Sequence, residues 1–224
     1  MYAPPVTRPG TSARTRNRRG EGARLREEIV EAASRLLEQS GSEAAITLRA
    51  VAREIGISAP SIYPHFASPA AILGAVLARA YDALLARVRL AVQGERDPVA
   101  RLRAIAHAYV SFAAEQPQRY RILFQRDRPP GAATIDTPET VEQMIGADAF
   151  AVVLDAVRDC IAIGASTAPS PLVAATELWV ALHGYVTLRA STPEFPWPDS
   201  DEILDDLITQ LARIEAIPPE PDRP

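Results

Sequence analysis

Apolar side chains recur every three or four residues through most of this 224-residue chain, and this spacing constrains its fold more than any other feature. An α-helix has 3.6 residues per turn, so such spacing gathers the apolar side chains on one helix face. No segment shows the apolar–polar alternation between hairpin turns that is typical of strands. The first stripe comprises Leu25, Ile29, Ala32, Ala33, Leu36 and Leu37, and the last comprises Leu204, Leu207, Ile208, Leu211 and Ile214. The sequence therefore predicts an all-α fold.

Capping residues mark where these helices begin and end. Thr47 and Ser58 are suited to N-cap the second and third helices, and Gly56 permits a sharp turn between them. Ser68-Pro69 and Asp97-Pro98 each pair a capping side chain with a proline in the first helical turn. The predicted helices run from Leu25 to a stop at Ser40-Gly41-Ser42, then over 48–55, 59 to about 63, 69 to about 92, 98 to about 115, 119–126, 140–163, 171–189 and 200–216.

The chain divides into a basic front and an acidic remainder. Through Phe66 the formal charge is +3, and the remaining residues carry −7. A basic front suggests that this part alone meets a polyanion. We predict a disordered basic arm over 1–20, a helix-turn-helix domain over 21–68, a larger helical regulatory and dimerisation domain over 69–217, and a disordered tail over 218–224.

Several function classes find no support in the sequence. A single cysteine, Cys160, excludes an internal disulfide and a cysteine-rich metal site, and it fits a reducing cytoplasm. Residues 172–188 form the most apolar window, but three polar or glycine positions interrupt it and it is shorter than a bilayer span. There is no glycine-rich phosphate loop, no zinc-protease motif and no clustered histidines. We therefore expect a cytoplasmic protein that is not an enzyme, has no membrane partner, and needs no cofactor or metal.

Residues 48–66 read as a helix, a glycine turn and a short second helix, which is the helix-turn-helix pattern. Ile57 and Ile62 would pack the short helix inward, which leaves its hydroxyl, proline and aromatic side chains facing outward. Hydroxyl and imidazole groups can bond phosphates or base edges, and Ala and Pro can contact a thymine methyl group. The predicted DNA-binding residues are Thr47, Arg49, Ser58, Ala59, Pro60, Ser61, Tyr63, His65 and Ser68.

Residues 25–73 resemble the DNA-binding domain of the TetR family of transcriptional regulators. The motif of that family, with a capping Thr, a small Ala, a Gly turn and a Ser-x-x-Ser/Thr-x-Tyr-x-His-Phe block, is matched by Thr47, Ala52, Gly56, Ser58, Ser61, Tyr63, His65, Phe66, Ser68 and Leu73. Two positions depart from it, since Pro69 and Ala70 stand where the family has lysine and an acidic residue. A phosphate contact usual in the family is therefore missing, and the arginine-rich arm over 1–20 could compensate for it.

The second half of the chain carries a shorter resemblance. Trp179, His183 and Gly184 are similar to a Trp-x-x-x-His-Gly element of one TetR regulatory-domain subgroup. The resemblance implies that the last two long helices, 171–189 and 200–216, form a homodimer surface. It also implies a small-molecule pocket, for which the candidate lining residues are Tyr81, Tyr109, Phe112, Phe124, Met144, Phe150, Trp179 and His183. Residue by residue, a place in the core or an interface is the more frequent role of such side chains.

Together these features predict a ligand-responsive transcriptional regulator, foremost a repressor. A homodimer would bind a palindromic double-stranded DNA operator and leave it when a small apolar effector binds. The alternatives are a non-specific DNA-binding helical protein, an activator of the same fold, and a small-molecule enzyme or carrier that keeps a vestigial helix-turn-helix. The acidic second half argues against generic coating of DNA.

Overall fold

The computed structural model describes residues 21–127 and 145–215. These residues contain eight α-helices and two short 3-10 helices, so the predicted all-α class is confirmed. The elements are α1 Glu21–Ser40, η1 Glu43–Ala45, α2 Leu48–Glu54, η2 Ala59–Ile62, α3 Pro69–Ala91, α4 Pro98–Glu115, α5 Pro117–Phe124, α6 Ala147–Ala162, α7 Pro171–Ser191 and α8 Ser200–Leu211. The predicted arm, the predicted tail, Met144 and the expected helix start at 140 lie outside the described residues.

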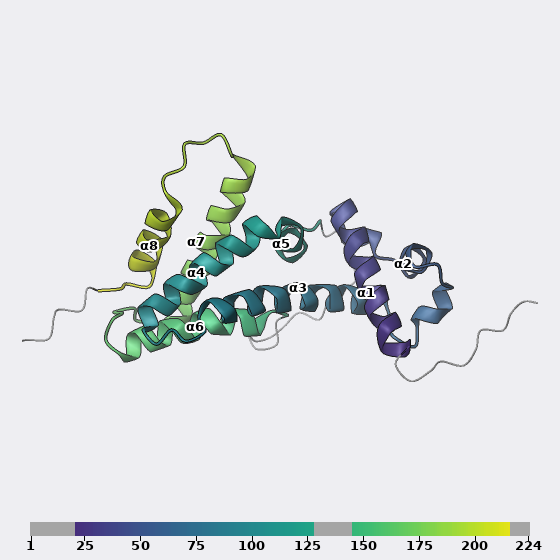
Figure 1. Ribbon diagram of the computed structural model, residues 1–224, viewed down its shortest axis with the longest axis horizontal. Helices are drawn as coiled ribbons and strands as arrows, with labels where there is room; N and C mark the ends of the chain where they lie inside the picture. The colour runs from purple at the N-terminus through teal and green to yellow at the C-terminus, as the bar shows by residue number, and fades with distance from the viewer. Residues whose placement is uncertain (1–20, 128–144, 216–224) are drawn as a thin grey trace, which may run out of the picture.

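The elements up to η2 form a small helical unit at one end of the elongated molecule (Figure 1). Its core is built from Ile29, Val51, Ile62 and Phe66, none of which is more than 4% exposed. Gly41 has a φ of +69°, and its amide donates to the carbonyl of Leu37 at 2.8 Å, which closes α1 in the left-handed C-cap predicted for it.

Helix α3 starts beside this unit and runs along α4 and α6 to the other end of the molecule (Figure 1). Its inner face carries Ile72, Val76, Leu84 and Val88, all buried. By length and composition α3 is also the one helix in the described ranges that could cross a membrane, a test that the core helix of a folded protein passes equally. Its buried face identifies it as such a core helix.

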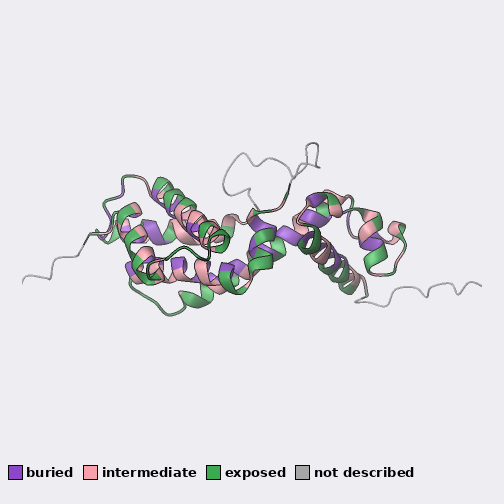
Figure 2. Cartoon of the chain, turned by 90° about the horizontal axis from the view of Figure 1, so that it is seen from above, coloured by how far each residue is buried: buried purple, intermediate pink, exposed green. Residues whose placement is uncertain are grey.

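Helices α4, α5 and α6 pack on α3, and α7 and α8 pack on α4 and on each other. Their buried positions lie mainly on the inside of this bundle (Figure 2). The largest fully buried side chains there include Phe112, Leu178 and Leu204. Burial of such side chains contributes about 1.5–3 kcal/mol each, which makes the apolar core the main source of stability.

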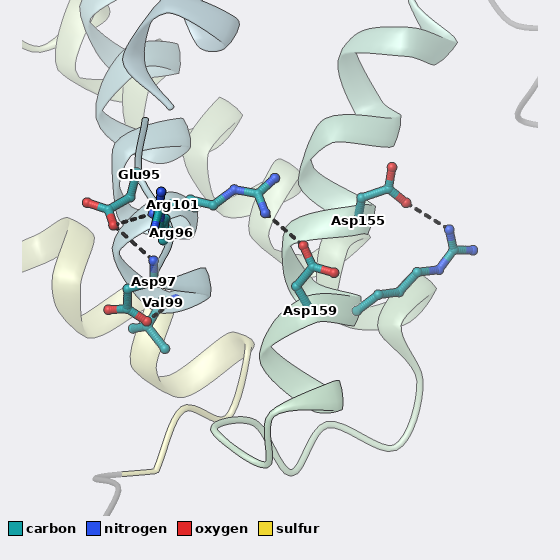
Figure 3. A network of polar contacts seen from close by, with 8 residues as sticks. Glu95, Arg96, Asp97, Val99, Arg101, Asp155 and Asp159 are labelled. Carbon is teal, nitrogen blue, oxygen red and sulfur yellow. Dashed lines mark hydrogen bonds and ion pairs between the residues drawn. The ribbon is translucent and has the colours of Figure 1, made fainter. Parts of the chain in front are cut away.

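Ion pairs at the surface join α4 to its neighbours. Arg101 donates to Asp159 on α6 at 2.8 Å (Figure 3), and Arg103 donates to Asp205 on α8 at 2.9 Å. Asp97 accepts from the amides of Val99 and Ala100 and so caps α4 as predicted. These exposed pairs stabilise the fold only slightly, but they favour one arrangement of α4.

Helix α8 ends at Leu211 and not at Ala216 as the apolar spacing predicted. Arg213 has a φ of +49°, and the amide of Ile214 donates to the carbonyl of Thr209 at 2.9 Å, which are features of a Schellman C-cap. The chain after α8 then pairs with the loop that follows α6, where Ser166 Oγ donates to the carbonyl of Ala212 at 2.6 Å. Tertiary hydrogen bonds therefore override the helical pattern at this end.

Two leucines test the placement of the core. Replacing Leu102, which is 2% exposed, with Ala should lower the free energy of unfolding by about 2–5 kcal/mol because a cavity remains. The matched change Leu90→Ala, at a position 65% exposed, should alter it by about 0.5 kcal/mol or less. Denaturant unfolding measures both, and equal losses would contradict the described packing.

Candidate functional site

One end of the molecule presents polar side chains from three elements: the start of α2, η2 and the start of α3. Thr47, Arg49, Pro60 and Tyr63 are exposed, and Tyr63 exposes 59% of its surface. An exposed tyrosine of this kind makes no contribution to the core and is available to a partner. We refer to this surface, with Ser61, His65 and Ser68, as the η2 surface.

The turn between α2 and η2 sets the direction of η2. Gly56 has a φ of +68°, its amide donates to the carbonyl of Arg53, and the amide of Ile57 donates to the carbonyl of Ala52 at 2.9 Å. This pair of bonds is a Schellman motif, which glycine accommodates without strain. Ile62 is fully buried and anchors η2 against the helices behind it. The helix-turn-helix predicted from the sequence is present, with a 3-10 helix as its second element.

Two sequence predictions on η2 need correction. Ser58 does not cap η2 through its side chain, because its hydroxyl bonds the hydroxyl of Ser61 at 2.7 Å. Pro60 has no amide hydrogen, so one of the usual cap donors is missing. Ala59 is not turned fully outward, since it is half-buried and packs against the core.

The hydroxyls at the starts of α2 and α3 serve as N-caps and remain free to donate. Thr47 accepts from the amide of Ala50 at 3.1 Å, and Ser68 accepts from the amide of Ala71 at 3.2 Å. A hydroxyl that accepts one hydrogen bond keeps its own hydrogen for another acceptor. Both helix starts can therefore present a donor, together with backbone amides, to an anion.

A second candidate site lies in the bundle between α3, α4, α6 and α7. It is a cavity of about 160 Å³. Its walls are almost wholly apolar, and they comprise Tyr81, Leu84, Val88, Ile105, Tyr109, Phe124, Ile145, Gly146, Ala147, Ala149, Phe150, Val153, Leu172, Thr176, Trp179 and Leu182. We call this space the bundle cavity.

Five of the eight side chains predicted for a pocket line the bundle cavity: Tyr81, Tyr109, Phe124, Phe150 and Trp179. Phe112, one turn after Tyr109, is instead fully buried in the core and is not part of the lining. His183 also lies outside the lining, next to Tyr120. The aliphatic and glycine positions of the wall carried no signal that would separate them from ordinary core residues.

Gly146 borders the cavity for a steric reason that sequence analysis missed. Its φ is +91°, and a Cβ atom at this position would lie 2.4 Å from the ring of Tyr81. Only glycine fits both the backbone conformation and the ring.

Three polar side chains, of which Tyr109 also lines the cavity, form a hydrogen-bonded chain. The hydroxyls of Tyr109 and Tyr120 lie 3.2 Å apart, and the hydroxyl of Tyr120 lies 2.7 Å from Nδ1 of His183. Burial raises the pKa of both tyrosines, and it lowers the pKa of His183. All three groups are therefore neutral at physiological pH.

Helix α5 joins the cavity region to the helix-turn-helix unit. Phe124 lines the cavity, and two residues later Arg126 donates to Glu43 at 2.6 Å. The Glu43 side chain is only 5% exposed, and Arg126 also donates to the last carbonyls of α5. Asp127 completes the junction, since its amide donates to the carbonyl of Gly41 at 2.8 Å and its carbonyl accepts from the amide of Glu43 at 3.0 Å. Sequence analysis missed this link because its partners are far apart in the chain.

The described residues show neither a metal site nor a reactive cysteine. No group of three or more His, Cys, Asp or Glu side chains there could hold a metal ion. Cys160 is buried, and burial raises its pKa to about 11, which keeps the thiol protonated and unreactive.

Comparison with known proteins agrees with this geometry. A family model described as bacterial regulatory proteins of the tetR family matches residues 29–76, and one described as the tetracyclin repressor-like C-terminal domain matches residues 102–211. The nucleoid occlusion factor SlmA of Vibrio campbellii is 31% identical over 98 residues, which are 44% of this chain and 50% of that protein. The chain spans about half the length of the curated relatives it matches.

Solved structures resemble the chain over more of its length. A protein of unknown function from Rhodococcus sp. RHA1 has a TM-score of 0.65 and 27% identity, and the match covers 84% of this chain and 94% of that one. A tetR family transcription regulator from Shewanella sp. PV-4 also has a TM-score of 0.65, with 84% and 96% covered; its 14% identity bears on the fold alone.

The fold and the helix-turn-helix define a DNA-binding transcription regulator rather than an enzyme. The two family models, which together span more than two thirds of the chain, specify which kind: the chain belongs to the TetR family.

The buried ion pair at the α5 junction can be tested by a mutant cycle. Arg126→Met should lower the free energy of unfolding by about 3–5 kcal/mol, because the Glu43 carboxylate would stay buried without a partner. The double variant Glu43→Met/Arg126→Met should recover most of this loss. Denaturant unfolding of the three proteins measures it, and a double variant no more stable than Arg126→Met would count against a buried pair.

Proposed function

We propose that the protein is a ligand-responsive repressor that binds a palindromic operator as a homodimer and is released by a small apolar effector. The observation that carries this proposal is the pairing of an exposed polar η2 surface with an apolar cavity, joined by one helix. Such a regulator acts in the cytoplasm, where it meets the DNA.

In this proposal η2 enters the major groove. Pro60 and Ser61, with the edge of Ala59, would meet base edges, and the Ser58–Ser61 hydroxyl pair would keep one hydrogen free to donate. Phosphates on either side would be held by Thr47 and Ser68 through their free hydroxyl hydrogens, and by Arg49, Tyr63 and His65. The phosphate contacts would position the protein on the duplex, and the contacts to base edges would read its sequence.

An exposed apolar face on α7 supports the homodimer. Val173, Val180 and Leu188 expose 54%, 62% and 56% of their surfaces on the side turned away from the core. Helix α8 packs against α7, and the side chains of Leu207 and Leu211 on α8 are only half-buried. A second copy of the same face would remove these side chains from water. Two-fold symmetry then predicts half-sites roughly 34–36 Å apart or a multiple of this distance.

Helix α5 gives the effector a route to the DNA-binding unit. A ligand in the bundle cavity would press on Phe124, and α5 would carry this displacement to Arg126 and Asp127, which hold Glu43 and Gly41. A tilt of the helix-turn-helix unit would change the spacing of the two η2 surfaces in the dimer. A ligand that binds this tilted state better than the operator-bound state lowers operator affinity.

The η2 surface is tested by removing its exposed ring. Tyr63→Ala should weaken binding to the operator duplex by about 1.5–3 kcal/mol, since a hydrogen bond to a charged phosphate is lost. Phe195→Ala, which removes a ring that is 55% exposed between α7 and α8, should leave operator affinity unchanged. Fluorescence anisotropy of labelled duplex measures both. Wild-type affinity in Tyr63→Ala would show that the reading surface lies elsewhere.

The dimer face is tested by charge. Val180→Glu should convert the protein to a monomer, because two-fold symmetry places two buried carboxylates in one interface without partners. Leu90→Glu, at an equally exposed apolar position on α3, should leave the dimer intact. Sedimentation velocity distinguishes the two states, and a dimeric Val180→Glu variant would exclude this face.

A further inference from the structure

The size of the bundle cavity limits what it can hold. Its volume of about 160 Å³ is close to the roughly 150 Å³ of an apolar cavity known to stay dry and to bind benzene. A single aromatic ring with a small substituent fits such a space. A long acyl chain or a fused multi-ring compound would extend beyond it.

The charge of the wall limits the ligand further. The cavity-lining residues of the described ranges include no Asp, Glu, Arg, Lys or His. The guanidinium of Arg126, two residues after the lining residue Phe124, is bound to Glu43 and to two carbonyls of α5. Burial of a charged ligand in these surroundings would cost far more than the apolar contacts provide. The described part of the wall therefore favours a neutral ligand.

One lining residue leads to a polar chain. Tyr109 lines the cavity, and its hydroxyl is hydrogen-bonded to that of Tyr120, which bonds His183 in turn. The direction of these hydrogen bonds depends on which nitrogen of neutral His183 carries the hydrogen, so Tyr109 can present either a donor or an acceptor. A ligand hydroxyl can match both cases, because it donates and accepts.

The aromatic wall favours a ring as the body of the ligand. Tyr81, Phe124 and Trp179 lie in edge or tilted contact, with ring centroids 6.1 Å apart for Tyr81–Phe124 and 6.4 Å for Phe124–Trp179. Further edge-to-face contacts with a bound ring are worth more than area alone.

We propose that the bundle cavity binds a neutral single-ring phenol, with its ring among Tyr81, Phe124 and Trp179 and its hydroxyl on Tyr109. This assignment rests on the proposed function in so far as the bound compound is the effector. Binding itself is independent of DNA and can be tested without it.

The test is isothermal titration of the full-length protein with four probes. Phenol should bind at one molecule per subunit. Toluene, which has the same shape but no hydroxyl, should bind roughly fivefold more weakly, as expected for the loss of one neutral hydrogen bond. Benzoate, which is charged, and 4-phenylphenol, which is too long, should not bind. Failure of phenol to bind, or tighter binding of either of the last two probes, overturns the proposal.

Variants locate the bound probe. Tyr109→Phe should reduce the affinity for phenol roughly fivefold, to that of toluene, and leave toluene binding unchanged. Ala149→Leu should abolish binding of both by filling the cavity, and Val153→Phe is the second filling variant should the first fail to fold. An unchanged preference for phenol in Tyr109→Phe, or unchanged binding in a folded filling variant, overturns the placement.

Operator binding separates this inference from the function on which it rests. Phenol that binds the cavity without releasing operator DNA upholds the ligand class and contradicts the effector role. Release of operator by compounds of another class, with no binding of phenol, overturns the ligand class and leaves the regulator standing.

Discussion

The buried ion pair of Arg126 with Glu43 ties the helix-turn-helix unit to the end of α5, beside the bundle cavity. Glu43 is almost fully buried and would be costly to leave unpaired, so Arg126 must stay against it. Because Arg126 also closes the end of α5, that helix is fixed at the turn between α1 and α2. Backbone bonds between Asp127 and the same turn make the junction rigid on both sides.

The two ends that this junction connects differ in chemistry. The η2 surface is rich in exposed hydroxyls and helix starts, which suit a polyanion whose position must be read closely. The bundle cavity is small, apolar and uncharged, which suits a neutral organic molecule. In the proposed function, occupancy of the cavity would change the affinity of this TetR-family regulator for DNA. Such coupling would need no new contact at the DNA, since Phe124 of α5 lines the cavity and Arg126, just after α5, bonds Glu43.

Local sequence signals predicted most of the fold. Thr47, Ser68 and Asp97 cap the helices assigned to them, and Gly41 and Gly56 adopt the left-handed conformation that their turns require. These features succeed because a cap depends on three or four neighbouring residues. The predicted end of α8 was wrong, because hydrogen bonds to the loop after α6 outweigh the local apolar pattern.

The candidate sites were less predictable, because they depend on packing between residues that are far apart in the chain. Tyr109 and Phe112 share one face of α4, and only the packing of α5 and α6 decides which of them borders a cavity. From the sequence alone, Glu43 is indistinguishable from a surface residue, because its partner Arg126 lies 83 positions later. Periodicity specifies which face of a helix is inward, and tertiary packing specifies what lies there.

Selection of bound duplexes from a random pool, with the purified protein at physiological salt, tests the central claim most directly. The account predicts a palindrome whose half-sites lie about one helical turn, or a multiple of it, apart. Recovery of no consensus, with binding that vanishes as salt rises, would contradict it and leave only non-specific attraction to phosphates.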